Sequence, residues 1–342
     1  MKAAVIRECG GIDKLVVEDI ETPKPEPGEA LVRIGAAGVN HLDHDIREGI
    51  SGFPLAMPHV PGIEGAGEIV ELGEGVNAAK VGDRVGVALL APCGQCTMCR
   101  GGQDNLCFNG NFLGATMWGT YAEYVCCKES QLVPLPDGLS FEKAAASHLC
   151  FGTAWHMTVH YGDVKAGQTV LVNAAGSGVG TSAIQIAKLH GARVIASAGS
   201  DEKLEKAKAL GADVVINYTK DNLAEAVMEA TDGLGAEIII ESVGGDVLVK
   251  SIEAAAKGGI LVTCGAHAGE QIELDVIQLF RKNLRFQGSV LSTRLEMERV
   301  FQLVAEGKLD PTIHAAMPLD DVQAAAALTR DRNFFGKMLL IP

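Results

Sequence analysis

The sequence of 342 residues is poor in positive charge and lacks long apolar runs. Lys and Arg total 29 against 43 Asp and Glu, which gives a formal net charge of −14. This balance excludes a binder of duplex nucleic acid, because such a protein needs a basic face to displace phosphate counterions. No stretch approaches the ~18 apolar residues of a transmembrane helix. The first residues also lack the apolar core of a signal peptide. We expect a cytoplasmic protein that does not associate with membranes.

Aromatic residues are scarce as well, at 5%, whereas glycine occurs 41 times and hydrophobic residues reach 47%. This composition fits an α/β protein with many tight strand–helix turns better than an aromatic-rich β protein. The length, at ~150 residues per domain, predicts two domains.

The nine cysteines are an odd number without a secretion signal, which argues against a disulfide framework. Four of them follow the spacing C-x2-C-x2-C-x7-C: Cys93, Cys96, Cys99 and Cys107. Four thiolates at this spacing can enclose one tetrahedral Zn²⁺ and leave no coordination position open for chemistry. An iron–sulfur cluster and four unrelated thiols are the alternatives. We predict one structural zinc ion in a lobe of residues 91–110.

Two patterns of hydrophobicity divide the chain. In residues 1–146 short apolar stretches are broken by Gly and Pro, which is typical of a mostly β domain. From residue 167 onward, apolar strands such as 169–173 and 236–241 alternate with helix-length segments, which indicates a parallel sheet covered on both faces. We predict a doubly wound (Rossmann) dinucleotide-binding domain at 147–289. Residues 290–342 are expected to return to the first domain.

A glycine-rich turn follows the strand at 169–173 and precedes a helix. It reads Ala175-Gly176-Ser177-Gly178-Val179-Gly180, a degenerate form of the G-x-G-x-x-G pattern. Small residues let the backbone approach a pyrophosphate, and the helix N-terminus favours the anion. We predict that Gly176, Ser177, Gly178 and Val179 bind the cofactor. The alternative is an ordinary tight turn.

The end of the second strand of this domain indicates which dinucleotide is preferred. An NAD site places a carboxylate there to bind the ribose 2′-hydroxyl. Here the strand ends in ASAGS, residues 196–200, without an acid. Ser200 can donate to a 2′-phosphate and Lys203 supplies positive charge, so we predict NADP(H) rather than NAD. The alternative makes Ser200 a helix N-cap and Lys203 a solvated residue.

Several motifs together resemble the medium-chain dehydrogenase/reductase superfamily, in its group of zinc-type alcohol dehydrogenases and quinone oxidoreductases. They cover essentially the whole chain: residues 38–43 (GVNHLD), 61–67 (PGIEGAG), 81–85 (VGDRV), 119–124 (GTYAEY), the four-cysteine lobe and the turn at 175–180. The resemblance implies a mostly β, GroES-like catalytic domain with a structural-zinc lobe, beside the Rossmann domain.

The resemblance also implies further cofactor contacts. NADPH users of the family place a tyrosine shortly after the third strand, where this chain has Tyr218. Lys337 resembles a family residue near the cofactor. The ends of two late strands are expected to meet the nicotinamide; their residues are Cys264, Gly265, Ala266, Gly288, Ser289 and Val290.

The catalytic zinc ligands of the resembled alcohol dehydrogenases are replaced in this chain. The three positions hold Asn40, Ile63 and, counting four residues back from Thr153, Leu149, with Cys150 one place away. Isoleucine and leucine cannot bind a metal. A cluster of neighbouring residues is chemically able to rebuild a site, although it shows no ligand spacing: His41, Asp43, His44, Asp45 and His59. We predict no catalytic zinc.

Without a Lewis acid, oxidation of an unactivated alcohol is difficult. An enone or quinone that accepts hydride needs only hydrogen-bond donors for its developing charge, and zinc-free members of the resembled family reduce such substrates with NADPH. We expect Asn40 to be an orienting donor, His41 a proton relay and Thr153 a neighbour of the nicotinamide. For His41 a structural or cleft-lining role is the alternative.

The main prediction is therefore an NADPH-dependent reductase of activated C=C bonds or quinones. The alternative is a zinc-dependent alcohol or aldehyde dehydrogenase with a displaced catalytic metal, and a third hypothesis is a nucleotide-binding protein without turnover. The substrate is expected to be a small enone, quinone, aldehyde or alcohol. Residues 283–290 are predicted to form a sheet edge, which favours a homodimer or a homotetramer.

Overall fold

A computed structural model describes residues 1–342, which divide into two compact units. Unit 1 comprises Met1–Leu149 and Thr293–Pro342, and unit 2 comprises Cys150–Ser292. The first crossing falls inside helix α3 (Phe141–Trp155). The domain borders expected from the sequence, at 146/147 and 289/290, lie close to these crossings.

A seven-stranded sheet forms the centre of unit 1, in the order β16-β17-β3-β4-β5-β9, with β8 also pairing with β3. Its strands are β3 (Glu29–Val39), β4 (Gly65–Leu72), β5 (Arg84–Val87), β8 (Tyr124–Lys128), β9 (Leu132–Pro134), β16 (Ile313–Pro318) and β17 (Lys337–Ile341). In the antiparallel pairing of β17 with β3, Met338 lies opposite Val39. This register brings Lys337, the first residue of the last strand, next to Asn40.

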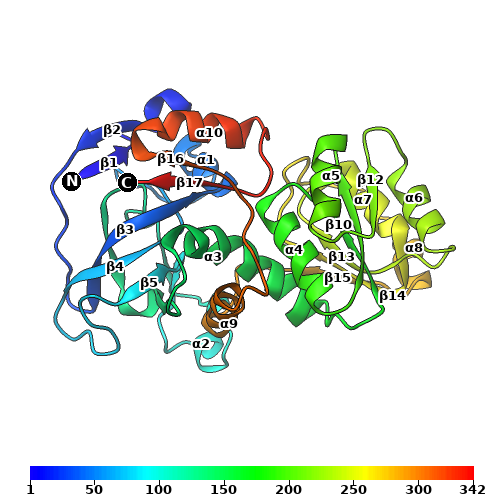
Figure 1. Ribbon diagram of the computed structural model, residues 1–342, viewed down its shortest axis with the longest axis horizontal. Helices are drawn as coiled ribbons and strands as arrows, with labels where there is room; N and C mark the ends of the chain where they lie inside the picture. Colours follow the sequence, from blue (N-terminus) through cyan, green and yellow to red (C-terminus); the bar gives the residue numbers. More distant parts are fainter. The chain divides into compact units, whose positions relative to one another are not determined.

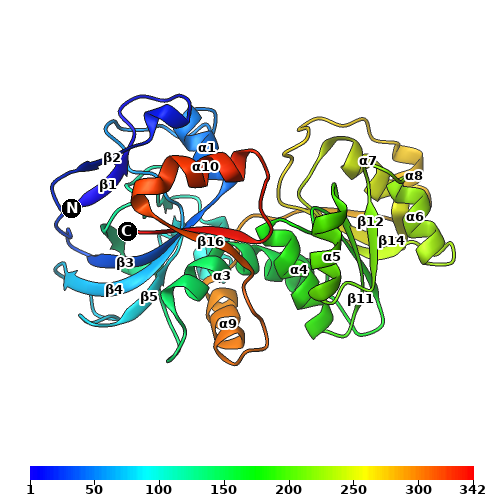
Figure 2. The same cartoon turned by 45° about the horizontal axis from the view of Figure 1, so that its top comes forward.

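The remaining elements of unit 1 are mostly short, and helix α9 (Arg294–Ala305), with 12 residues, is the longest of them. Besides the sheet it contains β1 (Lys2–Val5), η1 (Ile12–Lys14), β2 (Val16–Asp19), α1 (His41–Glu48), β6 (Leu90–Ala91), α2 (Thr97–Arg100), η2 (Asp104–Leu106), β7 (Asn111–Phe112), η3 (Glu129–Gln131), α9 (Arg294–Ala305), η5 (Leu319–Asp321) and α10 (Val322–Arg330). Figure 2 shows α10 beside α1. Helix α1 begins directly after β3, with Asn40 as its N-cap and Asp43 completing a capping box.

Unit 2 is built on one parallel sheet of six strands in the order β12-β11-β10-β13-β14-β15. The strands are β10 (Thr169–Val172), β11 (Arg193–Ala198), β12 (Val214–Asn217), β13 (Ala236–Glu241), β14 (Ala255–Thr263) and β15 (Arg285–Gly288). Numbered within the unit this order is 3-2-1-4-5-6, the Rossmann arrangement. The predicted doubly wound parallel sheet is confirmed.

Helices accompany the strands of this sheet, as Figure 1 shows. They are α4 (Gly178–Leu189), α5 (Asp201–Ala209), α6 (Leu223–Ala230), α7 (Gly245–Ala254) and α8 (Val276–Arg281), and a π-helical turn η4 (His156–Tyr161) continues α3. The central strand residues Leu171, Ile195 and Ile239 are fully buried, as a sheet covered on both faces requires.

Strand β15 forms one edge of the sheet, since it pairs with β14 alone. Phe286 on this strand is 46% exposed. The expected sheet edge is therefore present, whereas its pairing with a second copy stays a prediction. None of the helices has both the length and the apolar character that a membrane span requires.

Candidate functional site

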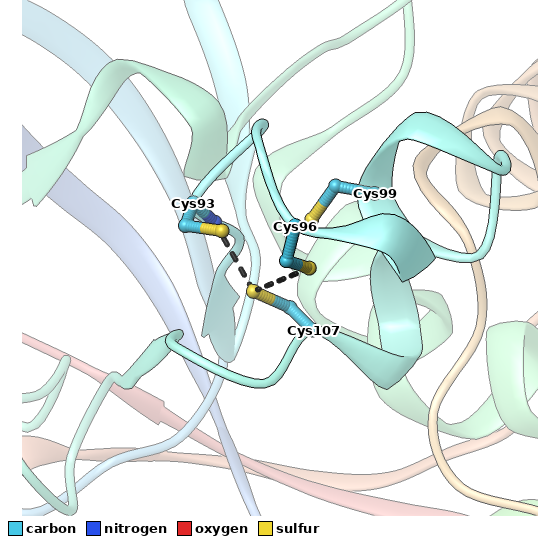
Figure 3. A group of neighbouring side chains, drawn as sticks. All are labelled: Cys93, Cys96, Cys99 and Cys107. Atoms are coloured by element: carbon cyan, nitrogen blue, oxygen red, sulfur yellow. Dashed lines mark hydrogen bonds between the residues drawn. The ribbon is translucent and has the colours of Figure 1, made fainter.

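The four cysteines of the predicted metal lobe converge on one point, as Figure 3 shows. Cys93 follows β6, Cys96 caps α2, Cys99 lies within α2 and Cys107 follows η2. Their four Sγ atoms all lie within 4.8 Å of one another. Backbone N–H groups of Cys99 and Phe108 lower the pKa of Cys96 to about 6, whereas burial raises the pKa of Cys99 to about 12. A set of four thiolates fits Zn²⁺ and closes its coordination shell.

A second polar group lies in unit 1 where β3, β4, α3 and β17 meet. We call Asn40, Glu64 and Lys337 the Lys337 cluster. The Lys337 ammonium forms an ion pair with Glu64 Oε1 and donates to Asn40 Oδ1. Asn40 Nδ2 donates to the same Glu64 oxygen at 2.7 Å. The Glu64 side chain is 0% exposed and that of Lys337 is 4% exposed, so a charge-balanced pair is enclosed by protein.

Glu64 connects the three positions at which the resembled alcohol dehydrogenases carry catalytic zinc ligands. Its Oε1 binds the side chain of Asn40, it follows the fully buried Ile63 in the chain, and its Oε2 accepts the backbone N–H of Leu149 at 2.8 Å. The positions thus offer an amide already bonded to an ammonium and a carboxylate, and two apolar side chains. This donor set does not fit a zinc ion.

The neighbouring acids and histidines hold the surrounding loops. Asp43 accepts Tyr121 Oη at 2.8 Å and the backbone N–H of Ile63 at 3.2 Å. Burial raises the pKa of Asp43 to about 6, and burial lowers the pKa of His44 to about 4. His59 Nε2 lies 2.9 Å from the carbonyl oxygen of Gly114.

The residues that the sequence offers for a displaced metal site do not converge on one point in this structure. No three of the candidates bring their ligand atoms within 4.8 Å of one another; they are His41, Asp43, His44, Asp45 and His59.

The predicted catalytic residues belong to different units. Asn40 and His41 lie in unit 1, at the start of α1, and Thr153 lies in unit 2, within α3. The ring of His41 makes an edge contact with His44 at a centroid distance of 5.8 Å. Asn40 Oδ1 accepts from Lys337, and Asn40 Nδ2 donates to Glu64. The amide N–H group expected to orient a substrate is therefore already bonded to Glu64. The catalytic roles of these residues stay predictions.

The glycine-rich turn has the predicted strand, turn and helix around it. Ser177 is the N-cap of α4, and its Oγ accepts the backbone N–H of Gly180 at 2.9 Å. A Cβ atom at Gly180 would lie 2.2 Å from the carbonyl oxygen of Ala174. Only glycine therefore allows α4 to approach β10 this closely. The helix N-terminus after the central strand has the form of a pyrophosphate site.

The candidate residues for the 2′-phosphate come together at the end of β11. Ser200 is the N-cap of α5 and accepts the backbone N–H of Lys203 at 3.4 Å. Tyr218 packs against Gly199, where a Cβ atom would lie 3.2 Å from Oη. The carboxylate of Asp201 is paired with Lys220. The N-cap role considered for Ser200 is thus present, and its contact with a phosphate stays a prediction.

The cofactor contacts expected further along the chain are distributed over both units. Those at the ends of β14 and β15 lie in unit 2, and the backbone N–H of Ser289 donates to Thr263 O at 2.8 Å. The group comprises Cys264, Gly265, Ala266, Gly288, Ser289 and Val290. Lys337, also expected near the cofactor, lies in unit 1 and is buried in the ion pair with Glu64, and its contact with the cofactor stays a prediction.

Sequence reasoning missed one acidic residue of unit 2. Glu241 ends β13, is 0% exposed and accepts backbone N–H groups of the loop that follows. Burial raises its pKa, whereas those hydrogen bonds act in the opposite direction. An acid closing the apolar run AEIIIE was the available signal, since an unpaired charge is rarely placed in a strand buried on both faces.

Comparisons with known proteins agree with this architecture. Residues 26–137 match the family described as alcohol dehydrogenase GroES-like domain, and residues 178–306 match the family described as zinc-binding dehydrogenase. An alcohol dehydrogenase of Geobacillus stearothermophilus is 36% identical over 323 residues, 94% of each chain.

Solved structures show the same similarity over the full length. A crystal structure described as an NAD-dependent alcohol dehydrogenase is 42% identical, with a TM-score of 0.95 and 100% of both chains covered. A thermostable alcohol dehydrogenase from Pyrobaculum aerophilum, solved with cobalt and zinc bound, is 31% identical, with a TM-score of 0.89 and coverage of 100% of this chain and 99% of that one.

Proposed function

Because this chain belongs to the medium-chain dehydrogenase/reductase superfamily, in its zinc-type alcohol dehydrogenase-like group, we propose that it interconverts small alcohols and carbonyl compounds without a catalytic zinc ion. The chain is an NAD(P)-dependent oxidoreductase on the same evidence. Its relatives are named alcohol dehydrogenases, which favours the substrate class of the alternative over the enone or quinone of the main prediction.

The Lys337 cluster is the observation that supports chemistry without a catalytic metal. A zinc ion would have to displace the ammonium from Glu64 and would find Ile63 and Leu149 where its other ligands belong. The four cysteines form a group that fits a metal, and they would hold one Zn²⁺ that stabilises the lobe without contacting substrate.

The nicotinamide supplies or accepts the hydride when it is bound. The protein must then stabilise the negative charge that develops on the carbonyl oxygen as the carbon gains the hydride, and must supply a proton to that oxygen. We propose that His41 delivers this proton from its partly exposed position at the start of α1. Since hydrogen bonds replace a Lewis acid, activated carbonyl compounds should be reduced much faster than simple alcohols are oxidised.

Reduction of enones and quinones is the second candidate. It is favoured by the misfit of the Asn40, Ile63 and Leu149 positions to a metal, because these substrates delocalise the charge left by hydride transfer. NADPH remains the proposed cofactor, since β11 ends without an acid and Ser200, Lys203 and Tyr218 lie near its end. The name of the NAD-dependent relative favours the opposite preference.

A substrate panel tests the proposal and separates the candidates. Oxidation of NADPH and NADH is followed with aldehydes, ketones, enones and quinones, and NADP⁺ reduction with the matching alcohols. We expect turnover of aldehydes or ketones that survives a chelator of catalytic zinc. Turnover confined to enones and quinones would select the second candidate. Absence of turnover with every acceptor would leave a nucleotide-binding protein and refute the enzyme proposal.

The oligomeric state belongs to this proposal as well. We propose that the exposed β15 edge pairs with a second copy in a homodimer or in a tetramer of such dimers, because an exposed edge otherwise invites uncontrolled pairing. Light scattering on the purified chain measures its mass directly. A monomer at micromolar concentration would refute the pairing.

A further inference from the structure

A fully buried carboxylate lies at the carboxyl edge of the sheet in unit 2. Glu241 is the last residue of β13, whose preceding three residues are isoleucines buried in the sheet. Removing a charged carboxylate from water is costly unless hydrogen bonds compensate. Its position therefore requires partners, and these come from the loop that follows.

The loop after β13 folds around the Glu241 carboxylate. Oε1 accepts the backbone N–H of Val243 at 2.7 Å and of Gly244 at 3.2 Å, and Oε2 also lies 3.2 Å from Gly244 N. Bonds from backbone N–H groups to a charged acceptor are stronger than those between neutral groups. The carboxylate thus fixes the course of residues 242–245, which lead into α7.

This loop in turn holds the loop that follows β14. The backbone N–H of Ala268 donates to Val243 O at 2.6 Å, and that of Gly245 donates to Gly269 O at 3.1 Å. Gly244 has φ of 75°, and a Cβ atom there would lie 2.3 Å from Gly269 O. The two loops, 242–245 and 264–269, are therefore hydrogen-bonded to each other, and we call them together the loop body. Glu241 is bonded to the first of them.

The place of the loop body in the strand order indicates which part of a dinucleotide would lie against it. Strands β10 and β13 are neighbours at the point where the strand order reverses, and doubly wound sheets bind ligands at the carboxyl ends of the strands there. The turn after β10 would hold the pyrophosphate, and β11 on one side would hold the adenosine ribose. The loops after β13 and β14 lie on the other side, which is left for the nicotinamide half.

We propose that Glu241 is a positioning residue for the nicotinamide half of the dinucleotide, acting through loops 242–245 and 264–269. The inference rests on the proposed function, since it presumes a nicotinamide cofactor. Glu241 does not touch the cofactor; it keeps the loops in their binding conformation before the cofactor arrives, so that little ordering entropy is lost on binding.

The same strand provides a matched control. Glu237 is an exposed residue near the amino edge of β13, and its carboxylate accepts the backbone N–H of Thr169 at 2.8 Å. Like Glu241, it is a glutamate of β13 that accepts a backbone N–H, but it lies away from the carboxyl edge. A general loss of sheet stability would affect both sites, whereas cofactor positioning concerns Glu241 alone.

The test compares Glu241→Gln and Glu237→Gln by fluorescence titration with NADPH and by competition with 2′,5′-ADP, which carries only the adenosine half. The amide of E241Q keeps one acceptor oxygen and turns an N–H group toward the loop. We expect E241Q to weaken NADPH binding about 10-fold or more and to leave 2′,5′-ADP binding within about 2-fold. E237Q should change neither. Unchanged NADPH binding, or equal weakening of both probes, would overturn the proposal.

Hydrogen exchange of the unaltered chain provides a second test, independent of whether E241Q folds. Amides of Val243, Gly244 and Ala268 should be protected before NADPH is added. Rapid exchange of all three without NADPH would contradict a preformed loop body. Failure of the unaltered chain to bind NADPH or NADH would instead refute the proposed function, so the two failures can be distinguished.

Discussion

The cysteine lobe and the Lys337 cluster lie in the same unit and differ in what they can bind. The lobe presents four sulfur atoms within 4.8 Å of one another. The cluster presents one carboxylate whose Oε1 is already paired with an ammonium and bonded to an amide. One region retains a full set of metal donors, and the other satisfies its buried charge without a metal. The two regions therefore differ in donor chemistry: four thiolates fit a zinc ion, whereas an amide, a paired carboxylate and two apolar side chains do not.

The largest effect should come from removing the cation of the cluster. Lys337→Met leaves Glu64 charged and enclosed, and breaking a buried pair in this way costs about 3–5 kcal/mol. Chemical denaturation of the variant measures the loss in the free energy of unfolding.

The double variant Glu64→Gln with Lys337→Met serves as its control. It removes both charges and should recover most of that stability. If the single variant is as stable as the unaltered chain, the cluster is not a charge pair that the fold depends on, and the comparison fails.

Removing one of the four cysteines should abolish zinc binding by the cysteine lobe. Cys107→Ser takes away one of the four sulfur donors, and the zinc content should fall from about one ion per chain to near zero. Hydrogen exchange across residues 91–110 should rise as the lobe loses its crosslink.

Asn40→Ala is the matched change in the cluster and should leave the zinc content unaltered. A loss of zinc in Asn40→Ala would indicate a metal at the Lys337 cluster and would contradict the claim that the two regions differ in metal binding.

A smaller effect concerns pH. Burial raises the pKa of Asp43 from 3.8 to about 6, so the folded chain holds this proton more tightly than the unfolded chain. The contribution of the Asp43 carboxyl to the free energy of unfolding is therefore complete below about pH 4 and is lost as the pH rises through 6. Relative to Asp43→Asn, the unaltered chain should lose up to about 3 kcal/mol of stability over this interval.

Unfolding free energies of both chains at several pH values measure the difference directly. Parallel profiles between pH 4 and pH 6.5 would mean that Asp43 titrates at its ordinary pKa, and that the loops beside the cluster enclose it less than the structure indicates.

Local patterns were sufficient to predict much of the fold. The cysteine spacing identified the lobe because its four donors lie within 15 residues of chain, positions 93 to 107. The alternation of apolar strands and helices identified the parallel sheet of unit 2, since each strand buried on both faces carries a continuous apolar run.

The partners of Lys337 could not be predicted in this way. Asn40 lies 297 residues earlier in the chain, and nothing local to either residue indicates that β17 pairs with β3. The family resemblance placed Lys337 near the cofactor and gave no sign of a carboxylate partner. The register of two distant strands brings it against Glu64. Glu241 was missed because its partners are backbone amides, which carry no residue-specific pattern.

The zinc content of the active, purified protein tests the central claim most directly. Elemental analysis against protein concentration, with activity followed on the same sample, should give about one zinc ion per chain, as four thiolates in one closed site predict. About two ions per chain, with activity lost in proportion to the second, would contradict the account and show that the chain holds a catalytic metal.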